Sequence, residues 1–235
     1  MTTTLIIGGG SGMGRALAAA LLTRGESVVI AGRDADRLKR AAVALPDGDL
    51  RAHTVDLADE ETIVELYDHA GPVDHVVTTA VDVRDAYLPV AALDPARVHA
   101  AFDAKVVGPL LLAKYAQGRV AESLTITAGF NAHRPAPGGA VIAAANGAVE
   151  ALVRALAVEL APIRVNAVAP GWVDTDLWDR LAGDERDTRL AAMAARLPVG
   201  RVGRAEDLAD AFIAVSRNGF TTGSVVHIDG GQRLV

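Results

Sequence analysis

The residues whose types and spacing most directly indicate chemistry form a glycine-rich loop near the start of the sequence. Apolar residues 5–7 are followed by glycines in the spacing Gly8-x-x-x-Gly12-x-Gly14. Glycine lets a backbone turn tightly and lets a phosphate approach it, and the free N–H groups at a helix start bind anions. The loop therefore predicts a pyrophosphate site, although a tight turn without a ligand is the alternative. The residues expected around the pyrophosphate are Gly8, Ser11, Gly12, Met13 and Gly14.

Such a loop needs a strand before it and a helix after it, and the rest of the sequence repeats that pattern. Short Val- and Ile-rich runs, typical of strands buried on both faces, alternate with Ala- and Leu-rich helical stretches. This alternation predicts one α/β domain over residues 1–235, with parallel strands joined by helical crossovers. Strands are expected at 4–7, 27–31, 51–55, 75–77, 123–127, 164–168 and 225–228. Helices are expected at 12–24, 34–45, 59–70, 94–118, 141–160 and 205–217.

One segment departs from the alternation. Residues 175–198 are charged and Ala/Leu-rich and follow a Pro-Gly turn. We interpret them as a helical insertion over the sheet edge that acts as a substrate lid. Trp172, Leu177 and Trp178 are expected to form an apolar wall of the substrate pocket or, alternatively, to pack in the core.

Composition excludes several classes of function. The chain has 235 residues, a formal net charge of -6 and no Lys/Arg-rich run, so nucleic acid is not an expected partner. Cysteine is absent, which removes disulfides, thiolate catalysis and Cys-ligated zinc. The six histidines show no metal-binding spacing, so no metal is expected. Without an apolar run long enough for a membrane span or signal segment, we expect a soluble, cytoplasmic protein.

Four motifs in order resemble the classical short-chain dehydrogenase/reductase family over essentially the whole chain. They are the glycine loop, Val55-Asp56-Leu57, the run Arg-Val-Asn-Ala-Val-Ala-Pro-Gly-Trp-Val-Asp-Thr at 164–175, and Thr-Gly-Ser-Val-Val-His-Ile-Asp-Gly-Gly at 222–231. The resemblance implies a Rossmann-type, doubly wound parallel sheet of seven strands and a nicotinamide cofactor over the strands' carboxyl ends. It further implies cofactor contacts from Asp56, Leu57, Ala80, Pro170, Val173 and Thr175.

The end of the second expected strand bears on which dinucleotide binds. An NAD enzyme generally places a carboxylate there to accept a hydrogen bond from the ribose 2′-hydroxyl. Here Gly32 takes that place and Arg33 follows, and a guanidinium can pair with a 2′-phosphate through two hydrogen bonds. We therefore expect NADP(H) rather than NAD(H). In the alternative, Asp34 bonds the ribose hydroxyls while Arg33 stacks on the adenine.

The family's catalytic tetrad is absent. The family uses Tyr as acid/base, Lys to lower the Tyr pKa and bind the nicotinamide ribose, Ser to polarise the carbonyl, and Asn to support a water bridge. The Tyr and Lys positions read Ile142 and Asn146, and the Asn position reads Lys105. Thr127 or Ala128 stands at the Ser position, and no tyrosine occurs between residues 120 and 172. The chain is therefore identified as a divergent member that lacks Tyr-x-x-x-Lys.

Four residues remain as catalytic candidates. We hypothesise that Lys105 and Asn146 are an exchanged pair, in which Lys105 bonds the ribose from the opposite helix. The alternative is a Lys105 side chain that extends to solvent. Thr127 could donate a hydrogen bond to a substrate oxygen or merely pack in its strand. His133 titrates near neutral pH and begins the substrate loop, or is simply solvated.

Three functions remain open. The first is an NADP(H)-dependent oxidoreductase with a noncanonical site, acting on a small organic carbonyl, imine or enone. The second is a regulatory protein that binds the cofactor without turnover, and the third is a non-redox enzyme on the same fold. The family often assembles through the helices expected at 94–118 and 141–160, whose apolar faces exceed what one sheet can cover, so a homodimer or homotetramer is expected.

Overall fold

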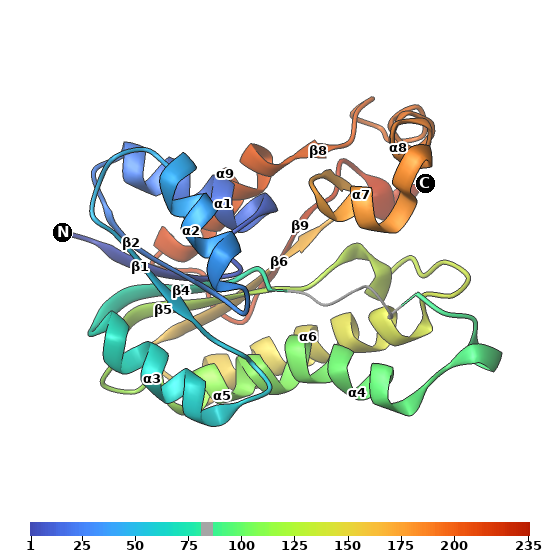
Figure 1. Ribbon diagram of the computed structural model, residues 1–235. Helices are drawn as coiled ribbons and strands as arrows, with labels where there is room; N and C mark the ends of the chain where they lie inside the picture. Colours follow the sequence, from blue (N-terminus) through green and yellow to red (C-terminus); the bar gives the residue numbers. More distant parts are fainter. Residues whose placement is uncertain (81–86) are drawn as a thin grey trace.

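A parallel sheet lies at the centre of the structure, a computed structural model that describes residues 1–80 and 87–235 (Figure 1). Its seven strands follow the order β3-β2-β1-β4-β5-β6-β9, and every neighbouring pair is parallel. This is the doubly wound Rossmann arrangement, so the predicted fold class is confirmed. The strands are β1 (Thr3–Ile7), β2 (Ser27–Gly32), β3 (Leu50–Thr54), β4 (Val73–Thr78), β5 (Val120–Thr127), β6 (Arg164–Pro170) and β9 (Val225–Ile228).

Helices cover both faces of the sheet. Figure 1 shows α1 (Gly12–Thr23), α2 (Ala35–Ala44) and α9 (Ala205–Arg217) on one face. The other face carries α3 (Glu60–Ala70), α5 (Gly108–Lys114) and α6 (Ala140–Glu159). Two-sided coverage explains why the strands read as continuous apolar runs rather than as alternating ones.

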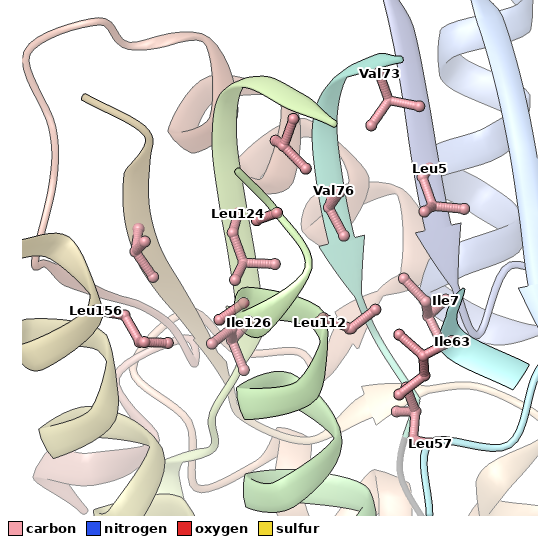
Figure 2. Packing of buried hydrophobic residues seen from close by; sticks show 14 of the residues in the cluster. Leu5, Ile7, Leu57, Ile63, Val73, Val76, Leu112, Leu124, Ile126 and Leu156 are labelled. Carbon is pink, nitrogen blue, oxygen red and sulfur yellow. The ribbon is translucent and has the colours of Figure 1, made fainter. Parts of the chain in front are cut away.

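Successive side chains of β1 supply the two cores on opposite faces of the sheet. Leu5 and Ile7 belong to the core beneath α3, α5 and α6, where Figure 2 shows Ile7 beside Ile63 and near Leu112. Ile6 belongs to the core under α1 and α9. Successive side chains of a strand point to opposite faces of the sheet, so neighbouring residues of β1 enter different cores.

The helix expected over 94–118 runs without a gap from Pro95 to Lys114 but changes its hydrogen-bonding pattern in the middle. The chain forms α4 (Pro95–Phe102), a π-helical segment (Asp103–Val107) and α5, which ends at Lys114. Pro109 explains the interruption because it has no N–H to donate and its ring crowds the carbonyl one turn earlier, which belongs to Lys105. A π-helical turn often marks a functional position. The expected helix is therefore present but ends at Lys114, and its π-helical turn, which was not predicted, contains Lys105.

The segment 175–198 contains two helices rather than one. They are α7 (Leu177–Ala182) and α8 (Arg186–Ala194), joined by a 3-10 turn at Gly183–Glu185 in which Gly183 has a φ of +50°. A second small sheet of β7 (Val173–Asp174) and β8 (Gly203–Arg204) closes the two ends of the segment. Both ends of α7–α8 are therefore held against the main body of the fold.

The longest helix, α6, is apolar enough to cross a membrane by length and composition alone, the one such helix in the described residues. Its buried residues Val149, Val153 and Leu156 pack into the core beneath the sheet, and Figure 2 shows Leu156 beside the strands. This packing identifies α6 as a core helix of the fold.

Candidate active site

A cleft of about 560 Å³ lies at the carboxyl ends of the strands. Its walls come from the loops after β1, β2, β3 and β4, from α4 and from the start of α7. The chain after β1 crosses to one side of the sheet and the chain after β4 to the other, which is where doubly wound folds bind ligands. Among the residues expected to bind the cofactor, those that line the cleft are Gly8, Ser11, Gly12, Met13, Arg33, Asp56, Leu57, Ala80 and Thr175.

The glycine loop has a shape that larger residues would prevent. Gly8 and Gly12 adopt φ values of +90° and +49°, a region that side chains other than glycine rarely occupy. Gly14 does not line the cleft, but a Cβ there would lie 2.4 Å from the Gly8 carbonyl oxygen. The predicted residues are therefore brought together, with Gly14 acting through close packing rather than through contact with the cleft.

The start of α1 is open to an anion. Its N-cap, Ser11, makes no side-chain capping hydrogen bond, and no acidic residue stands in the first turn. The first N–H groups of a helix need acceptors, and the helix dipole favours a negative one. Because Ser11, Gly12 and Met13 line the cleft, the residues present fit a pyrophosphate at this point.

Two guanidinium groups stand at the far end of the cleft. Arg33 and Arg37 both line it. Asp34 caps α2: its Oδ1 accepts a hydrogen bond from the backbone N–H of Arg37 at 2.9 Å. This bond lowers the pKa of the Asp34 carboxyl. Sequence reasoning missed Arg37, although the signal was there: a capping Asp34 places Arg37 on the first turn of α2, beside Arg33.

The middle of the cleft is shaped by short hydrogen-bonded turns. Asp56 Oδ1 accepts a hydrogen bond from the Ala58 N–H at 3.0 Å, which holds the Asp56–Leu57 turn against the cleft. Thr79, before Ala80, donates its hydroxyl to the Ile7 carbonyl oxygen at 3.2 Å. These bonds hold Asp56, Leu57 and Ala80, three of the expected cofactor contacts, in place in the wall of the cleft.

The residues expected on the nicotinamide side are divided. Thr175 lines the cleft, whereas Pro170 and Val173 do not. Pro170 ends β6 and Val173 is buried in β7, where it pairs with Gly203. Pro170 and Val173 can therefore contact a ligand only through their backbone atoms.

Lys105 is buried inside the π-helical segment, with 5% of its surface exposed. Its Nζ donates a hydrogen bond to the Ala128 carbonyl oxygen at 3.3 Å, which uses one of its three N–H donors. Burial lowers the pKa of Lys105 to about 8. Thr127 or Ala128 holds the position of the family's serine, so an ionisable group lies next to the reacting centre that the resemblance implies.

Asn146 lies on the other side of the same short segment. It is 1% exposed, its Oδ1 is buried without a hydrogen-bond partner, and its Nδ2 is 2.7 Å from where a Gly129 Cβ would stand. Lys105 and Asn146 therefore flank Ala128 and Gly129 at the end of β5. A buried carbonyl oxygen without a partner costs free energy, so Asn146 Oδ1 is an unused acceptor close to, but not lining, the cleft.

The other two catalytic candidates are engaged elsewhere. Thr127 donates its hydroxyl to the Thr78 carbonyl oxygen at 2.7 Å, a bond between neighbouring strands. His133 Nε2 lies 2.8 Å from Glu150 Oε1. None of the four candidates lines the cleft; Ala104, the residue before Lys105, does. The structure thus places Lys105 and Asn146 around one segment but does not bring Thr127 or His133 to them by any hydrogen bond between described residues.

The position of the family's tyrosine is apolar. Ile142 is buried in a cluster with Ala101 of α4, and Leu177 and Leu181 of α7 pack against this cluster. Trp178 is buried as well, donates its indole N–H to the Val173 carbonyl oxygen at 2.9 Å, and its ring lies 4.1 Å from that of Trp172. Trp178 is therefore a packing residue, whereas Leu177 lines the cleft.

Comparisons with known proteins agree with this geometry. The profile of a family described as enoyl-(acyl carrier protein) reductase matches residues 8–233. The short-chain dehydrogenase/reductase ATR9 of Stachybotrys chlorohalonatus (strain IBT 40285) is 38% identical over 251 residues, covering 98% of this chain and 96% of that protein.

Two solved structures are similar to this chain over its whole length. The MalC reductase/Diels-Alderase of Malbranchea aurantiaca superposes with a TM-score of 0.94 at 31% identity, covering 100% of this chain and 97% of that one. A small-chain dehydrogenase in complex with NADPH superposes with a TM-score of 0.83 at 31% identity, covering 100% and 99%.

Proposed function

The chain belongs to the short-chain dehydrogenase/reductase family of oxidoreductases, and we propose that it is an NADP(H)-dependent reductase of small organic carbonyl compounds or enones. The observation that carries the proposal is a cleft lined by the glycine loop and by Arg33, with the buried Lys105 next in the chain to the lining residue Ala104. The pKa of Lys105 is lowered to about 8. The active site is noncanonical because Ile142 and Asn146 replace the tyrosine and lysine of the family.

The family binds a nicotinamide cofactor, and the charges in the cleft support NADP(H). A 2′-phosphate carries negative charge that Arg33 and Arg37 are placed to meet. Asp34, the carboxylate that would favour NAD(H), already accepts the Arg37 N–H as the cap of α2. The related structure that holds NADPH is consistent with this preference.

Lys105 narrows the class of substrate. When bound, NADPH supplies a hydride, and reduction of a carbonyl or an enone also needs one proton, at the oxygen or at the α-carbon. At pH 7 a group with a pKa of about 8 is mainly protonated, so Lys105 carries a proton and a positive charge. That charge stabilises a developing oxyanion or enolate and repels an iminium ion. We therefore rank ketones and enones above imines.

The surroundings of Ile142 favour an apolar substrate. Ile142, Leu177 and Leu181 form a cluster between α6 and α7, and we propose that residues 175–198 act as the substrate lid over it. The similar MalC structure is described as a reductase/Diels-Alderase, which is consistent with reduction of an organic substrate on this fold. The lid sequence, rather than the cofactor loop, then sets substrate choice.

The test is a fluorescence titration with NADPH and NADH, followed by loss of NADPH absorbance against a panel of ketones, enones and cyclic imines. We expect NADPH to bind at least about tenfold more tightly than NADH, because it gains charge-assisted hydrogen bonds of about 1.5–3 kcal/mol. We expect turnover with an enone or ketone and less with an imine.

The matched control is Arg33→Ala with Arg37→Ala, which should remove the preference for NADPH and leave NADH binding within about twofold. Equal binding of both cofactors by the unaltered protein would refute the NADP(H) assignment. Binding of NADPH without turnover of any substrate would support a regulatory protein instead. No binding of either cofactor would leave a non-redox enzyme on this fold.

We also propose that the protein is a homodimer or homotetramer. The outer face of α6 exposes the small or apolar residues Ala144, Gly147, Ala151, Ala155 and Val158 at helical spacing, with the exposed Arg154 as the charged residue among them. Small residues let a second helix approach closely, and burying such a face in a symmetric copy removes apolar surface from water.

The expected result is an oligomeric mass in sedimentation velocity and a shift to monomer in Val158→Arg, because Val158 is 79% exposed at that face and a buried unpaired charge is costly. The control Val43→Arg alters a residue of α2 that is 89% exposed and should leave the mass unchanged. A monomeric unaltered protein at micromolar concentration would contradict the proposal.

For the location we propose the cytoplasm. A chain of 235 residues without cysteine makes no disulfide, which is consistent with a reducing compartment.

A further inference from the structure

Three side chains from separate elements meet on the side of the molecule that carries α6. His133 follows the 3-10 turn after β5, Glu150 lies on α6, and His227 lies on β9. One potential ligand atom from each lies within 4.8 Å of the others. The His133 Nε2–Glu150 Oε1 distance is 2.8 Å, and the two imidazole rings meet edge to face with centroids 4.8 Å apart.

The hydrogen bonding of this cluster is incomplete. His227 Nδ1 is buried and has no hydrogen-bond partner among the described residues. A buried polar atom without a partner costs free energy, and a histidine nitrogen can be satisfied by a metal ion as well as by a donor.

We propose that His133, Glu150 and His227 form a binding site for a zinc ion, with water in the fourth position. Two imidazoles and one carboxylate are a donor set typical of zinc with three protein ligands. Ligand atoms around a tetrahedral zinc stand about 3.3 Å apart. The widest separation here therefore has to close by rotation of side chains, and His133 is free to rotate because 43% of its side chain is exposed.

The charges around the cluster are compatible with a divalent cation. Arg233 is a positive neighbour of His227, but its Nη1 lies 3.3 Å from Asp229 Oδ2, which offsets that charge. Glu150 contributes a negative charge within the cluster itself, with 15% of its side chain exposed. The hard cations Mg²⁺ and Ca²⁺ prefer all-oxygen sites, so the two histidines select against them.

The site would join parts of the fold that border the active centre. Glu150 is one helical turn beyond Asn146 on α6, and His133 ends the turn that follows Ala128 and Gly129. None of the three ligands lines the cleft. A bound zinc would therefore tie β9 and α6 to the loop after β5, outside the cleft and independently of the proposed reductase activity.

The experiment measures zinc binding to the full-length, chelator-treated protein by competition with a zinc-sensitive dye. We expect one Zn²⁺ per chain, a higher melting temperature with Zn²⁺, and visible absorption typical of a four-coordinate complex when Co²⁺ replaces it. His227→Asn, His133→Asn and Glu150→Gln should each weaken binding at least tenfold and remove the thermal shift. Mg²⁺ in excess should not compete.

The control pair is His53→Asn and His69→Asn, which alters the stacked histidines at the opposite part of the sheet, whose ring centroids lie 4.5 Å apart. That variant should bind Zn²⁺ as the unaltered protein does. Absence of zinc binding, or equal binding by the His227→Asn and Glu150→Gln variants, would overturn the proposal. Circular dichroism of each variant distinguishes a lost ligand from a lost fold. Because the readout is metal binding, it is independent of whether the protein reduces any substrate.

Discussion

Replacing Lys105 with methionine is expected to lower kcat by at least about 10²-fold, the lower end of what a positioned acid or base supplies. Methionine has nearly the same length and volume but carries neither proton nor charge. The Lys105 ammonium donates to the Ala128 carbonyl oxygen at 3.3 Å, beside the serine position of the family. If Lys105 acts on the substrate, the loss appears in kcat while the Kd for NADPH changes by less than tenfold. If Lys105 instead bonds the nicotinamide ribose, the Kd rises and kcat changes less.

The pH dependence gives a second readout for Lys105. The proton-bearing form is the active one, so kcat of the unaltered protein should fall as the pH rises through about 8. The pKa in the folded state lies below the ordinary value of 10.5, so the unfolded chain binds more protons between these two values. The free energy of unfolding should therefore increase with pH across that window, and this increase should vanish in Lys105→Met.

Lys39→Met is the matched control, because Lys39 lies on α2 with 79% of its side chain exposed. It should leave kcat, the pH profile and the Kd unchanged. Lys105→Met should unfold no more easily than the unaltered protein at pH 7, because it removes the cost of burying an ammonium group. Full activity in Lys105→Met, across the whole pH range, would refute a role for this side chain in the reaction.

The second large effect is expected at Gly14. Gly14→Ala should weaken NADPH binding by at least about 100-fold, and it should lower the free energy of unfolding by about 1–3 kcal/mol, as overpacking does. The new Cβ would lie 2.4 Å from the Gly8 carbonyl oxygen and 2.6 Å from Thr79 Oγ1. Relief of these contacts requires α1 to move away from the glycine loop, and the anion site at the start of α1 moves with it.

Gly219→Ala is the control for this substitution. A Cβ at Gly219 meets nothing within 4 Å, and its φ lies outside the region reserved for glycine. Its effect on unfolding should stay within about 0.5 kcal/mol, and NADPH binding should be unchanged. Fluorescence titration and thermal unfolding measure both variants. NADPH binding by Gly14→Ala within twofold of the unaltered protein would show that α1 and the loop can separate without loss of the site.

The layout of the fold was predictable because it rests on local patterns. The continuous apolar run before Gly8 and its equivalents in the other strands mark strands buried on both faces, and the alternation with helices dictates parallel pairing. The interruption at Asp103–Val107 was not predicted, because Ala- and Leu-rich sequence on both sides of Pro109 favours a helix. The helical character of the segment 175–198 was predicted, but its division into two helices at Gly183 was not.

The candidate site divides in the same way. Gly8, Ser11, Gly12 and Arg33 were predicted from sequence because a phosphate site depends on the backbone freedom of glycine and on residues adjacent in the chain, and all four line the cleft. Arg37 was missed because its approach to the cleft depends on the capping of α2 by Asp34. The hydrogen bond from Thr127 to the Thr78 carbonyl oxygen was not predicted for a related reason. Thr78 lies on the neighbouring strand, far from Thr127 in the sequence.

By itself the sequence determined the class of fold and the position of the glycine loop after the first strand, because these follow from residue type and from spacing along the chain. The tertiary structure alone decided which polar groups are buried, which lack a hydrogen-bond partner and which lie close together. Lys105 is buried with a pKa lowered to about 8, Asn146 Oδ1 lacks a partner, and His133 meets Glu150 and His227. The physical reason is that burial and hydrogen-bond partners are set by residues far apart in the chain, and these two quantities control protonation, charge and metal affinity.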